Sequence, residues 1–456
     1  MRWRRTLIFI PYAWGLLIGI LIVAFTVWRV HLSHDLDREL SAIHAAGQPT
    51  SGEELDCYYT HIPDGQNAAI VMEQAFALAK NYSDNRSNEL NHFKVISYDQ
   101  PLSPEQVALL DGYVALNLNV LATLHEAVRI PDCRYPIDLS QGMDTKLPHL
   151  RDLETVSSLE EYRALLDLNA GRQNEITRTI LDTLNVAHTL DREPLIISQL
   201  VRMRIQNIAV EILEHRLNVG EMPEPERTNL YTAFVAAEKT NSMALALIGE
   251  RAMALPYFHL SLTEMERLGG SADTNDVIDG GAPLSGRTFL PFEWSGFYGR
   301  DERFYLQAMR TNIMLETMIP PSGPMIYDFE QKVFAACTRH YYIFSALLLP
   351  AASAAFNREA TGLAELRAAR LALQVEVFRA QRGRLPRDLN DLVPRFIPAV
   401  LEDPFDGQPM RYHTLTNGYV IYSVGRDLHD NGGRERPPDA KSSDKTEYDI
   451  TFTVHR

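Results

Sequence analysis

Acidic residues separated by glycines are the first candidates for chemistry in this sequence. Asp273, Asp276 and Asp279 lie in the segment 269–299, which also carries several glycines. Carboxylate oxygens on such a loop can ligate a cation or exchange protons with a substrate. A solvated acidic loop has the same composition, so both interpretations stay open.

Aromatic side chains share that segment and its surroundings. They can line a ligand groove or stack on a glycan, and they can equally pack a long loop onto a helical core. An envelope hydrolase with its site between a helical body and the 269–299 loop is therefore the alternative to a protein without enzymatic activity. The aromatic residues are Phe289, Phe292, Trp294, Phe297 and Tyr298.

Motifs that identify enzymes by residue spacing are missing from the sequence. It has no His-Glu-x-x-His, Cys-x-x-Cys, Walker A or Gly-x-Ser-x-Gly pattern. Ser442 and Lys445 have Ser-x-x-Lys spacing in a polar stretch flanked by prolines, which chance explains. His188, His215 and His340 are expected on helices as ordinary core or surface residues. We therefore expect no catalytic residues and no enzyme.

Composition and charge limit the class of protein. The 456 residues are 45% hydrophobic and 23% charged, which is typical of a globular chain of two or three domains. The formal net charge is −15. Such a charge repels nucleic acid, so a nucleic-acid partner is not expected.

An uncharged segment near the amino terminus predicts a membrane-spanning helix. Leu7 to Trp28 covers 22 residues. As a helix it would be about 33 Å long, enough for a hydrocarbon core of about 30 Å. Arg2, Arg4 and Arg5 precede it, and this positive charge favours a cytoplasmic amino terminus. The remainder of the chain would then lie outside the cytoplasmic membrane.

A cleaved signal peptide is the competing interpretation of this segment. Its apolar region would be about 7 to 15 residues long and would end at a small-x-small site. Residues 25–28 read FTVW and offer no such site. We expect a cytoplasmic tail at 1–6, an uncleaved single-pass anchor at 7–30 and a juxtamembrane segment at 31–52, in the inner membrane of a bacterium.

The three cysteines would face an oxidising compartment in that topology. Cys57 and Cys133 are a possible disulfide pair, which spacing alone does not establish, and Cys337 would be left over.

Residues 53–355 are expected to form a helical extracytoplasmic domain. Ser103 and Ser158 each begin a capping-box pattern, which predicts helix starts. Between Pro194 and Leu217, apolar residues recur every three or four positions, as in an amphipathic helix.

The last part of the chain, 356–456, predicts a long helix packed on a small antiparallel sheet. A helical stripe ends before Gly383, which suits a helix C-cap. Asn417-Gly418 marks a hairpin tip between two alternating segments, and residues 450–454 form a closing strand. The stripe consists of Ala364, Ala368, Leu371, Val375 and Phe378.

This terminal module resembles the major pseudopilin of bacterial type II secretion systems, the protein G family. The matching runs are RAARLALQVEVFRAQRGRLPRDLNDLVP, DPFDGQPMRY and NGYVIYSVGRD, followed by a terminal YDI. The whole chain also resembles bacterial membrane-anchored proteins that carry such a module after a helical body. The anchor lacks the glutamate of a pseudopilin helix, so the resemblance is to a reused domain.

The resemblance implies calcium as a cofactor, because major pseudopilins bind Ca²⁺ near their last strands. Carried over by position, the ligands would be Asp427 and Asp449, and Asp430 is a further acidic residue of the same loop. An Asp/Asn/Gly loop that only turns the chain is the alternative. We therefore expect a mainly α protein, anchored by one helix, that binds or scaffolds other envelope proteins.

Overall fold

The computed structural model describes residues 3–81, 89–90, 101–238, 241–259, 296–317, 323–437 and 448–456. These residues form a mainly helical protein with a small antiparallel sheet near the carboxyl end, as expected. The α-helices are α1 (Trp3–Ala45), α2 (Gly52–Tyr58), α3 (Ala68–Leu78), α5 (Pro104–Leu116), α6 (Leu118–Ala127), α7 (Pro148–Asn169), α8 (Gln173–His188), α9 (Ile196–Val219), α10 (Glu224–Glu238), α11 (Ser242–Ala254), α14 (Phe297–Thr317), α15 (Gly323–His340) and α16 (Ile343–Arg382). The 3-10 helices are η1 (Asp64–Gln66), η2 (Leu139–Asp144), η3 (Leu255–His259) and η4 (Leu389–Leu392). The strands are β1 (Arg411–Leu415), β2 (Gly418–Ser423) and β3 (Ile450–Val454), in the order β1-β2-β3.

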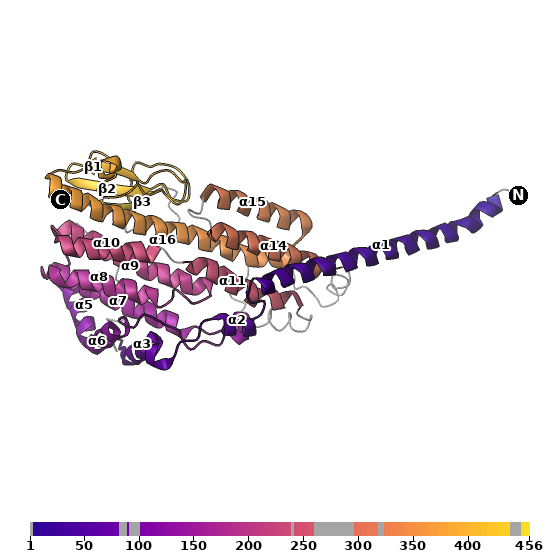
Figure 1. Cartoon of the computed structure of the whole chain (residues 1–456), viewed down its shortest axis with the longest axis horizontal. Helices are drawn as coiled ribbons and strands as arrows, with labels where there is room; N and C mark the ends of the chain where they lie inside the picture. The colour runs from indigo at the N-terminus through magenta and orange to yellow at the C-terminus, as the bar shows by residue number, and fades with distance from the viewer. Residues whose placement is uncertain are drawn as a thin grey trace.

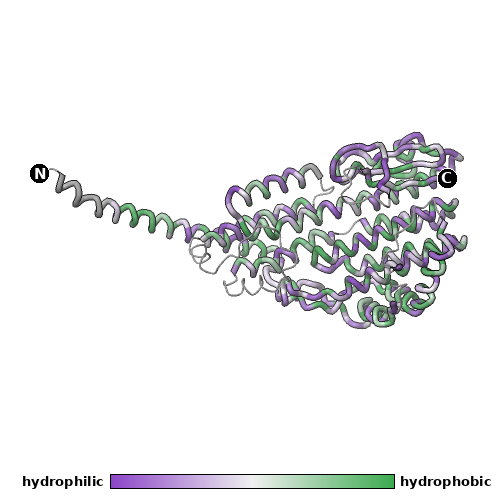
Figure 2. The backbone as a smooth tube through the Cα atoms, turned by 180° about the vertical axis from the view of Figure 1, so that it is seen from behind, coloured by the Kyte–Doolittle hydropathy of each residue, from purple (hydrophilic) through white to green (hydrophobic). Residues whose placement is uncertain are grey.

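Helix α1 protrudes from the body, and the two chain termini lie at opposite ends of the molecule (Figure 1). Its Trp14–Ala45 part is long and apolar enough to cross a membrane. Figure 2 shows that hydrophobic residues dominate the middle of the protruding part. Such a surface needs an apolar environment. The helix is therefore compatible with a membrane anchor or a signal sequence.

The carboxyl part of α1 packs on α14. Leu32 of α1 is buried. Asp35 pairs with Arg303 at 2.5 Å, and Glu39 pairs with Arg310 at 2.9 Å. The expected juxtamembrane stretch is thus largely a continuation of the same helix, and it ties the direction of α1 to the body.

Helix α9 is the centre of the helical body. It packs against α7 and α8 on one side and against α16 on another. Besides the expected apolar residues it buries the polar side chains of Gln199, Arg202 and Gln206. Ile197, which the periodicity places on the apolar face, is instead 48% exposed. Helices pack on several sides of α9. Polar residues of α9 are therefore buried that would be in contact with water if only one face of the helix were covered.

One of the two expected capping boxes is confirmed. The hydroxyl of Ser103 accepts a hydrogen bond from the amide of Gln106, and the Gln106 side chain accepts one from the amide of Ser103. The second is wrong, because α7 begins at Pro148 and Ser158 therefore lies in the middle of the helix. Proline at the first helical position supplies the start signal there.

Helix α16 leads from the helical body into the carboxy-terminal module without a linker. The expected domain boundary at residue 356 lies inside this single 40-residue helix. Gly383 ends the helix with a φ of 67°, as expected for a C-cap. In the hairpin, Leu415 pairs with Gly418, so the turn lies one residue earlier than the Asn-Gly pattern indicates.

The module and the helical body share one hydrophobic core. Apolar residues of α8, α9, α10, α16 and the sheet belong to the same buried cluster. At the outer edge of β3, the side-chain amide of Asn218 donates to the carbonyl of Thr453 at 2.9 Å, and the Glu214 carboxylate accepts from the amide of Thr453. Side chains of α9 therefore cover a strand edge that would otherwise expose unpaired backbone groups.

The DPFDGQP motif forms a buried polar junction at the start of the sheet. The Asp403 carboxylate is fully buried. It accepts hydrogen bonds from the amides of Phe405 and Val424 and from the hydroxyl of Ser423. It also pairs with Arg411 of β1 at 2.6 Å. The DPFDGQP motif thus has a structural role in this chain.

The possible disulfide is not formed. Cys57 is exposed and Cys133 is buried, and both are free thiols, as is the buried Cys337.

Candidate functional site

A pocket lies where the helical body meets the carboxy-terminal module. Its volume is about 810 Å³, and residues of α9, α10, α14, α15 and α16 line it together with the loops at 404–405 and 426–428. We call it the acidic pocket, because five carboxyl groups line it with three arginines. The charged residues are Arg202, Glu238, Glu316, Glu330, Glu359, Arg367, Arg426 and Asp427.

Glu316 of α14 and Glu359 of α16 form a carboxyl pair in this pocket. Burial raises the pKa of both groups, and the negative charge of Glu359 raises the pKa of Glu316 further. Two like charges in a poorly hydrated site cannot both ionise at ordinary pH. We therefore assign a proton to Glu316 at neutral pH. Its Oε2 atom is buried without a hydrogen-bond partner among the described residues.

Arg202 of α9 supplies a positive charge beside this pair. Its side chain is only 3% exposed. Its Nε donates to the side-chain carbonyl of Gln199 at 2.7 Å, and its Nη1 lies 3.5 Å from Asp191. The guanidinium lowers the pKa of Glu359 against the effect of burial. Glu359 is therefore the member of the pair that ionises first.

A second arginine of the pocket is occupied by neighbouring groups. Nε of Arg367 donates to Glu238 at 3.0 Å, and its Nη1 donates to the carbonyl of Glu402 at 2.6 Å. Glu238 also pairs with Arg370. Glu238 is thereby paired with two guanidinium groups, so it adds no free negative charge to the pocket.

The three predicted calcium ligands have different surroundings. Asp427 lines the acidic pocket and accepts a hydrogen bond from the amide of His429 at 3.0 Å. Asp430 accepts from the hydroxyl of Tyr422 at 3.1 Å and from the amide of Gly432 at 2.9 Å.

Asp449 is the buried member of the three. Its carboxylate accepts hydrogen bonds from the amides of Asn431, Gly433 and Arg434, at 3.3, 2.7 and 3.3 Å. Within the described residues, no three His, Cys, Asp or Glu side chains are grouped so that they could hold a metal ion. Calcium sites also use backbone carbonyls, and calcium binding here stays a prediction.

Calcium at about 1 mM is expected to raise the melting temperature of the full chain in detergent. Extracellular calcium-binding modules bind the ion in this concentration range. Asp430→Asn should remove this response. Asp449→Asn should lower stability by about 1–3 kcal/mol even without calcium, because three amides lose a charged acceptor. A melting temperature that calcium leaves unchanged would contradict the site.

Several residues that the sequence singles out lie outside the described residues. This set comprises Asp273, Asp276, Asp279, Phe289, Phe292, Trp294, Ser442 and Lys445. The site of the alternative hydrolase is therefore not described. Phe297 lines a second cavity, and Tyr298 packs against Phe344 with 5.7 Å between ring centroids.

The three helical histidines have no common site. His188 pairs with Asp191 at 2.5 Å, and this partner raises its pKa. Burial lowers the pKa of His215 to about 4. The ring of His340 lies 5.5 Å from that of Tyr342. These are the ordinary core and surface environments that the sequence suggests.

A buried histidine network was not indicated by the sequence. His149 lies 3.0 Å from Glu193, and the hydroxyl of Ser198 donates to the same carboxylate. Both His149 and Glu193 are almost completely buried. Since the serine bonds to the carboxylate and not to the imidazole, the geometry is structural and is not that of an activated nucleophile.

Sequence reasoning also missed the main residues of the acidic pocket. One signal was present in α9, where Gln199, Arg202 and Gln206 recur every three or four positions and form a polar stripe. Glu316 and Glu359 lie far apart in the chain, and only the packing of α14 on α16 brings them together.

Comparisons of the chain with protein-family models, with curated proteins and with solved structures found no match. The functional interpretation therefore rests on α1 and on the geometry of the acidic pocket.

Proposed function

We propose that this chain is a single-pass protein of the bacterial cytoplasmic membrane that acts as a binding or scaffolding component of the cell envelope. Arg2, Arg4 and Arg5 before the apolar segment support a cytoplasmic amino terminus. The helical body and the pseudopilin-like module then lie outside the membrane. The ion pairs between α1 and α14 support a body held at a fixed angle to its anchor.

The acidic pocket carries the proposal of binding. It lies at the junction between body and module, and its five carboxyl groups outnumber its three arginines. One of the five, Glu316, is neutral until its proton leaves. Met203, Phe356 and Phe405 add apolar surface. A ligand that matches both properties is a peptide segment with basic and apolar side chains, supplied by another envelope protein.

Binding of such a cation couples to the proton on Glu316. A positive charge beside the pair favours the ionised form, so a Lys or Arg side chain that enters the pocket displaces the proton. Affinity for the basic peptide should therefore increase as the pH is raised. A neutral ligand of the same shape would not release a proton.

Calorimetry with a matched pair of peptides tests this function. One peptide alternates leucine and lysine, and the other alternates leucine and glutamate. We expect binding of the basic peptide alone, with proton release seen as an enthalpy that depends on the ionisation enthalpy of the buffer. Glu359→Gln should weaken binding about tenfold or more, a loss of at least ~1.4 kcal/mol.

The matched control is Glu365→Gln. Glu365 is also a glutamate of α16 with a raised pKa, about 8, but it does not line the pocket. This variant should bind the basic peptide like the unchanged protein. Equal binding of both peptides, or equal loss in both variants, would contradict a role of the acidic pocket.

A second candidate function is acid–base hydrolysis at the same carboxyl pair. Two neighbouring carboxyl groups that hold one proton can act as acid and base. In that case Glu316→Gln would abolish turnover of a substrate while peptide binding persisted. If the chain is only a binding component, neither the unchanged protein nor the Glu316→Gln variant should turn over a substrate.

A further inference from the structure

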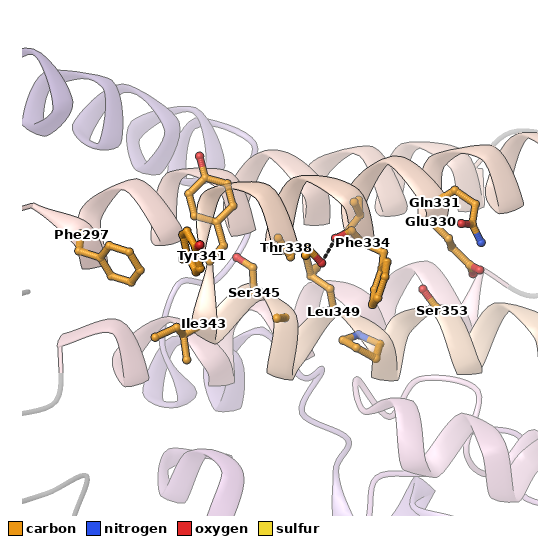
Figure 3. A pocket seen from close by; sticks show the side chains of 15 residues that line it. Phe297, Glu330, Gln331, Phe334, Thr338, Tyr341, Ile343, Ser345, Leu349 and Ser353 are labelled. Carbon is orange, nitrogen blue, oxygen red and sulfur yellow. Dashed lines mark hydrogen bonds between the residues drawn. The ribbon is translucent and has the colours of Figure 1, made fainter. Parts of the chain in front are cut away.

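A second cavity runs between α15 and α16, and its lining is more apolar than that of the acidic pocket. Its volume is about 940 Å³. We call it the α15–α16 groove. Its sides are formed mainly by apolar groups, with Phe334, Cys337 and Thr338 on α15 and Ile343, Ala346 and Leu349 on α16 (Figure 3).

Large apolar side chains at this groove are open to the surroundings. Both Phe334 of α15 and Tyr341, which follows α15, line the groove, and they are 73% and 75% exposed. An apolar patch of this kind on a soluble surface marks a contact with another protein, a ligand or a membrane.

One end of the groove lies beside the point where α1 leaves the proposed bilayer. Gly296 packs against Trp28, because a Cβ atom at Gly296 would lie 3.0 Å from Cη2 of the indole and 2.6 Å from the Arg29 guanidinium. Phe297, the next residue, lines the groove. Trp28 is the last residue of the uncharged segment that begins at Leu7. The Phe297 end therefore lies at the membrane surface if α1 spans the membrane.

The residues at this end suit a lipid–water interface. Figure 3 shows Phe297, Tyr341 and Ile343 at one end of the groove, and Glu330 and Ser353 at the other. Aromatic side chains favour the interfacial region of a bilayer.

Positive charge accompanies these aromatic residues. The guanidinium of Arg300 lies 5.8 Å from the ring centroid of Tyr342, and Arg339 is exposed in the last turn of α15. With Arg29 of α1 they place three arginines near the membrane-facing end. Anionic phospholipid headgroups attract basic residues at this depth.

We propose that the α15–α16 groove holds an acyl chain of an anionic phospholipid from the adjacent bilayer, with the headgroup near Arg300 and Arg339. This inference rests on the proposed membrane anchoring by α1. From Ile343 to Ser353 the groove follows α16 for about 15 Å. The apolar path ends at Glu330 and Ser353, which limits how far a chain can enter.

A lipid is favoured over a protein segment by the position of the open end. The groove begins where the anchor emerges, and the basic and aromatic residues gather at that end. A lipid already present in the bilayer reaches the groove by moving only its acyl chain. An acyl chain also needs no hydrogen-bond partner, in keeping with the apolar sides.

Photo-crosslinking in nanodiscs tests the proposal on the full chain. The discs contain phosphatidylcholine and phosphatidylglycerol, with a trace of phosphatidylglycerol that carries a diazirine on its acyl chain. Mass spectrometry then locates the adducts. We expect adducts on the groove residues of α15 and α16 in addition to α1. The same label on phosphatidylcholine should give fewer groove adducts.

Two exposed alanines provide a matched pair of variants. Ala346 lines the groove, whereas Ala335 is exposed on α15 and does not line it. Ala346→Arg should reduce groove adducts more than about tenfold, because a charge in a hydrocarbon-filled groove is costly. Ala335→Arg should leave them unchanged. Arg339→Glu should remove the preference for phosphatidylglycerol.

The possible outcomes separate this inference from the proposed function. If the chain does not enter nanodiscs, the anchor itself fails. If it enters and the adducts are confined to α1, or fall equally in both alanine variants, the groove does not hold lipid while the anchor stands. Thermal melting of each variant checks that the fold is retained, and Thr338→Arg replaces Ala346→Arg if that variant does not fold.

Discussion

Replacing Asp403 with alanine is expected to lower the free energy of unfolding by about 3–5 kcal/mol, the cost of breaking a buried ion pair. The substitution would leave Arg411 with one carboxylate fewer at the junction. It would also remove the acceptor of the Val424 amide and of the Ser423 hydroxyl, both in a buried environment. Chemical denaturation of the full chain in detergent, followed by circular dichroism, measures the change.

Asp406→Ala is the control for this prediction. Asp406 also pairs with Arg411, but it is partly exposed and lies at the rim of the junction. A loss of about 1 kcal/mol or less is expected there. If both variants lose the same stability, Asp403 is no more than a surface partner of Arg411, and the assigned role of the DPFDGQP motif is wrong.

Raising the pH from 7 to 9 is expected to destabilise the folded protein markedly. Burial raises the pKa of Glu161 to about 7, so most of its contribution is already lost at pH 7. Burial raises the pKa of Glu365 to about 8 and that of Glu316 well above its usual value, so these two groups lose theirs above pH 7. In the unfolded chain these groups ionise near pH 4.5. The folded state therefore holds more protons, and this stability is present below the unfolded pKa and is lost as the pH rises through the folded values.

For each proton that only the folded state retains, the free energy of unfolding falls by roughly 1 kcal/mol or more per pH unit as the pH rises. His215 has the opposite sign, because its pKa is lowered to about 4, but its effect is complete once the pH exceeds its usual value. Above pH 7 the carboxyl groups thus determine the trend. Urea unfolding at several pH values measures the slope.

Glu316→Gln isolates the carboxyl pair of the acidic pocket. The glutamine keeps the shape without the titration, so the variant should lose less stability between pH 7 and 9 and be more stable than the unchanged protein at pH 9. Glu53→Gln, at an exposed position of α2, should leave the slope as it is. An identical slope in Glu316→Gln and the unchanged protein would show that Glu316 is already ionised at pH 7.

Local patterns allowed much of the fold to be predicted from sequence. The apolar segment before Trp28, the capping box at Ser103, the cap at Gly383 and the closing strand at 450–454 all depend on neighbours in the chain. A local pattern can also mislead, because the capping-box pattern at Ser158 lies in the middle of α7, which begins at Pro148. The shared core of body and module was also not foreseen, because it depends on contacts between distant segments.

The candidate site was predicted only at its rim. Asp427 was identified through the resemblance to pseudopilins, and it lines the acidic pocket. Glu316, Glu359 and Arg202 come from three helices, and a charged residue on an amphipathic helix looks like a solvated one until the neighbouring helices are placed. Their burial is a tertiary property, and no single stretch of sequence contains it.

The position of the body outside the cytoplasmic membrane is the central claim, and labelling of Cys57 tests it most directly. Cys57 is exposed on α2, just after α1, whereas Cys133 and Cys337 are buried. A membrane-impermeant maleimide should label Cys57 in spheroplasts, and Cys57→Ser should abolish the signal. In inside-out vesicles the thiol should be protected. Labelling in inside-out vesicles but not in spheroplasts would place the body in the cytoplasm and contradict the account.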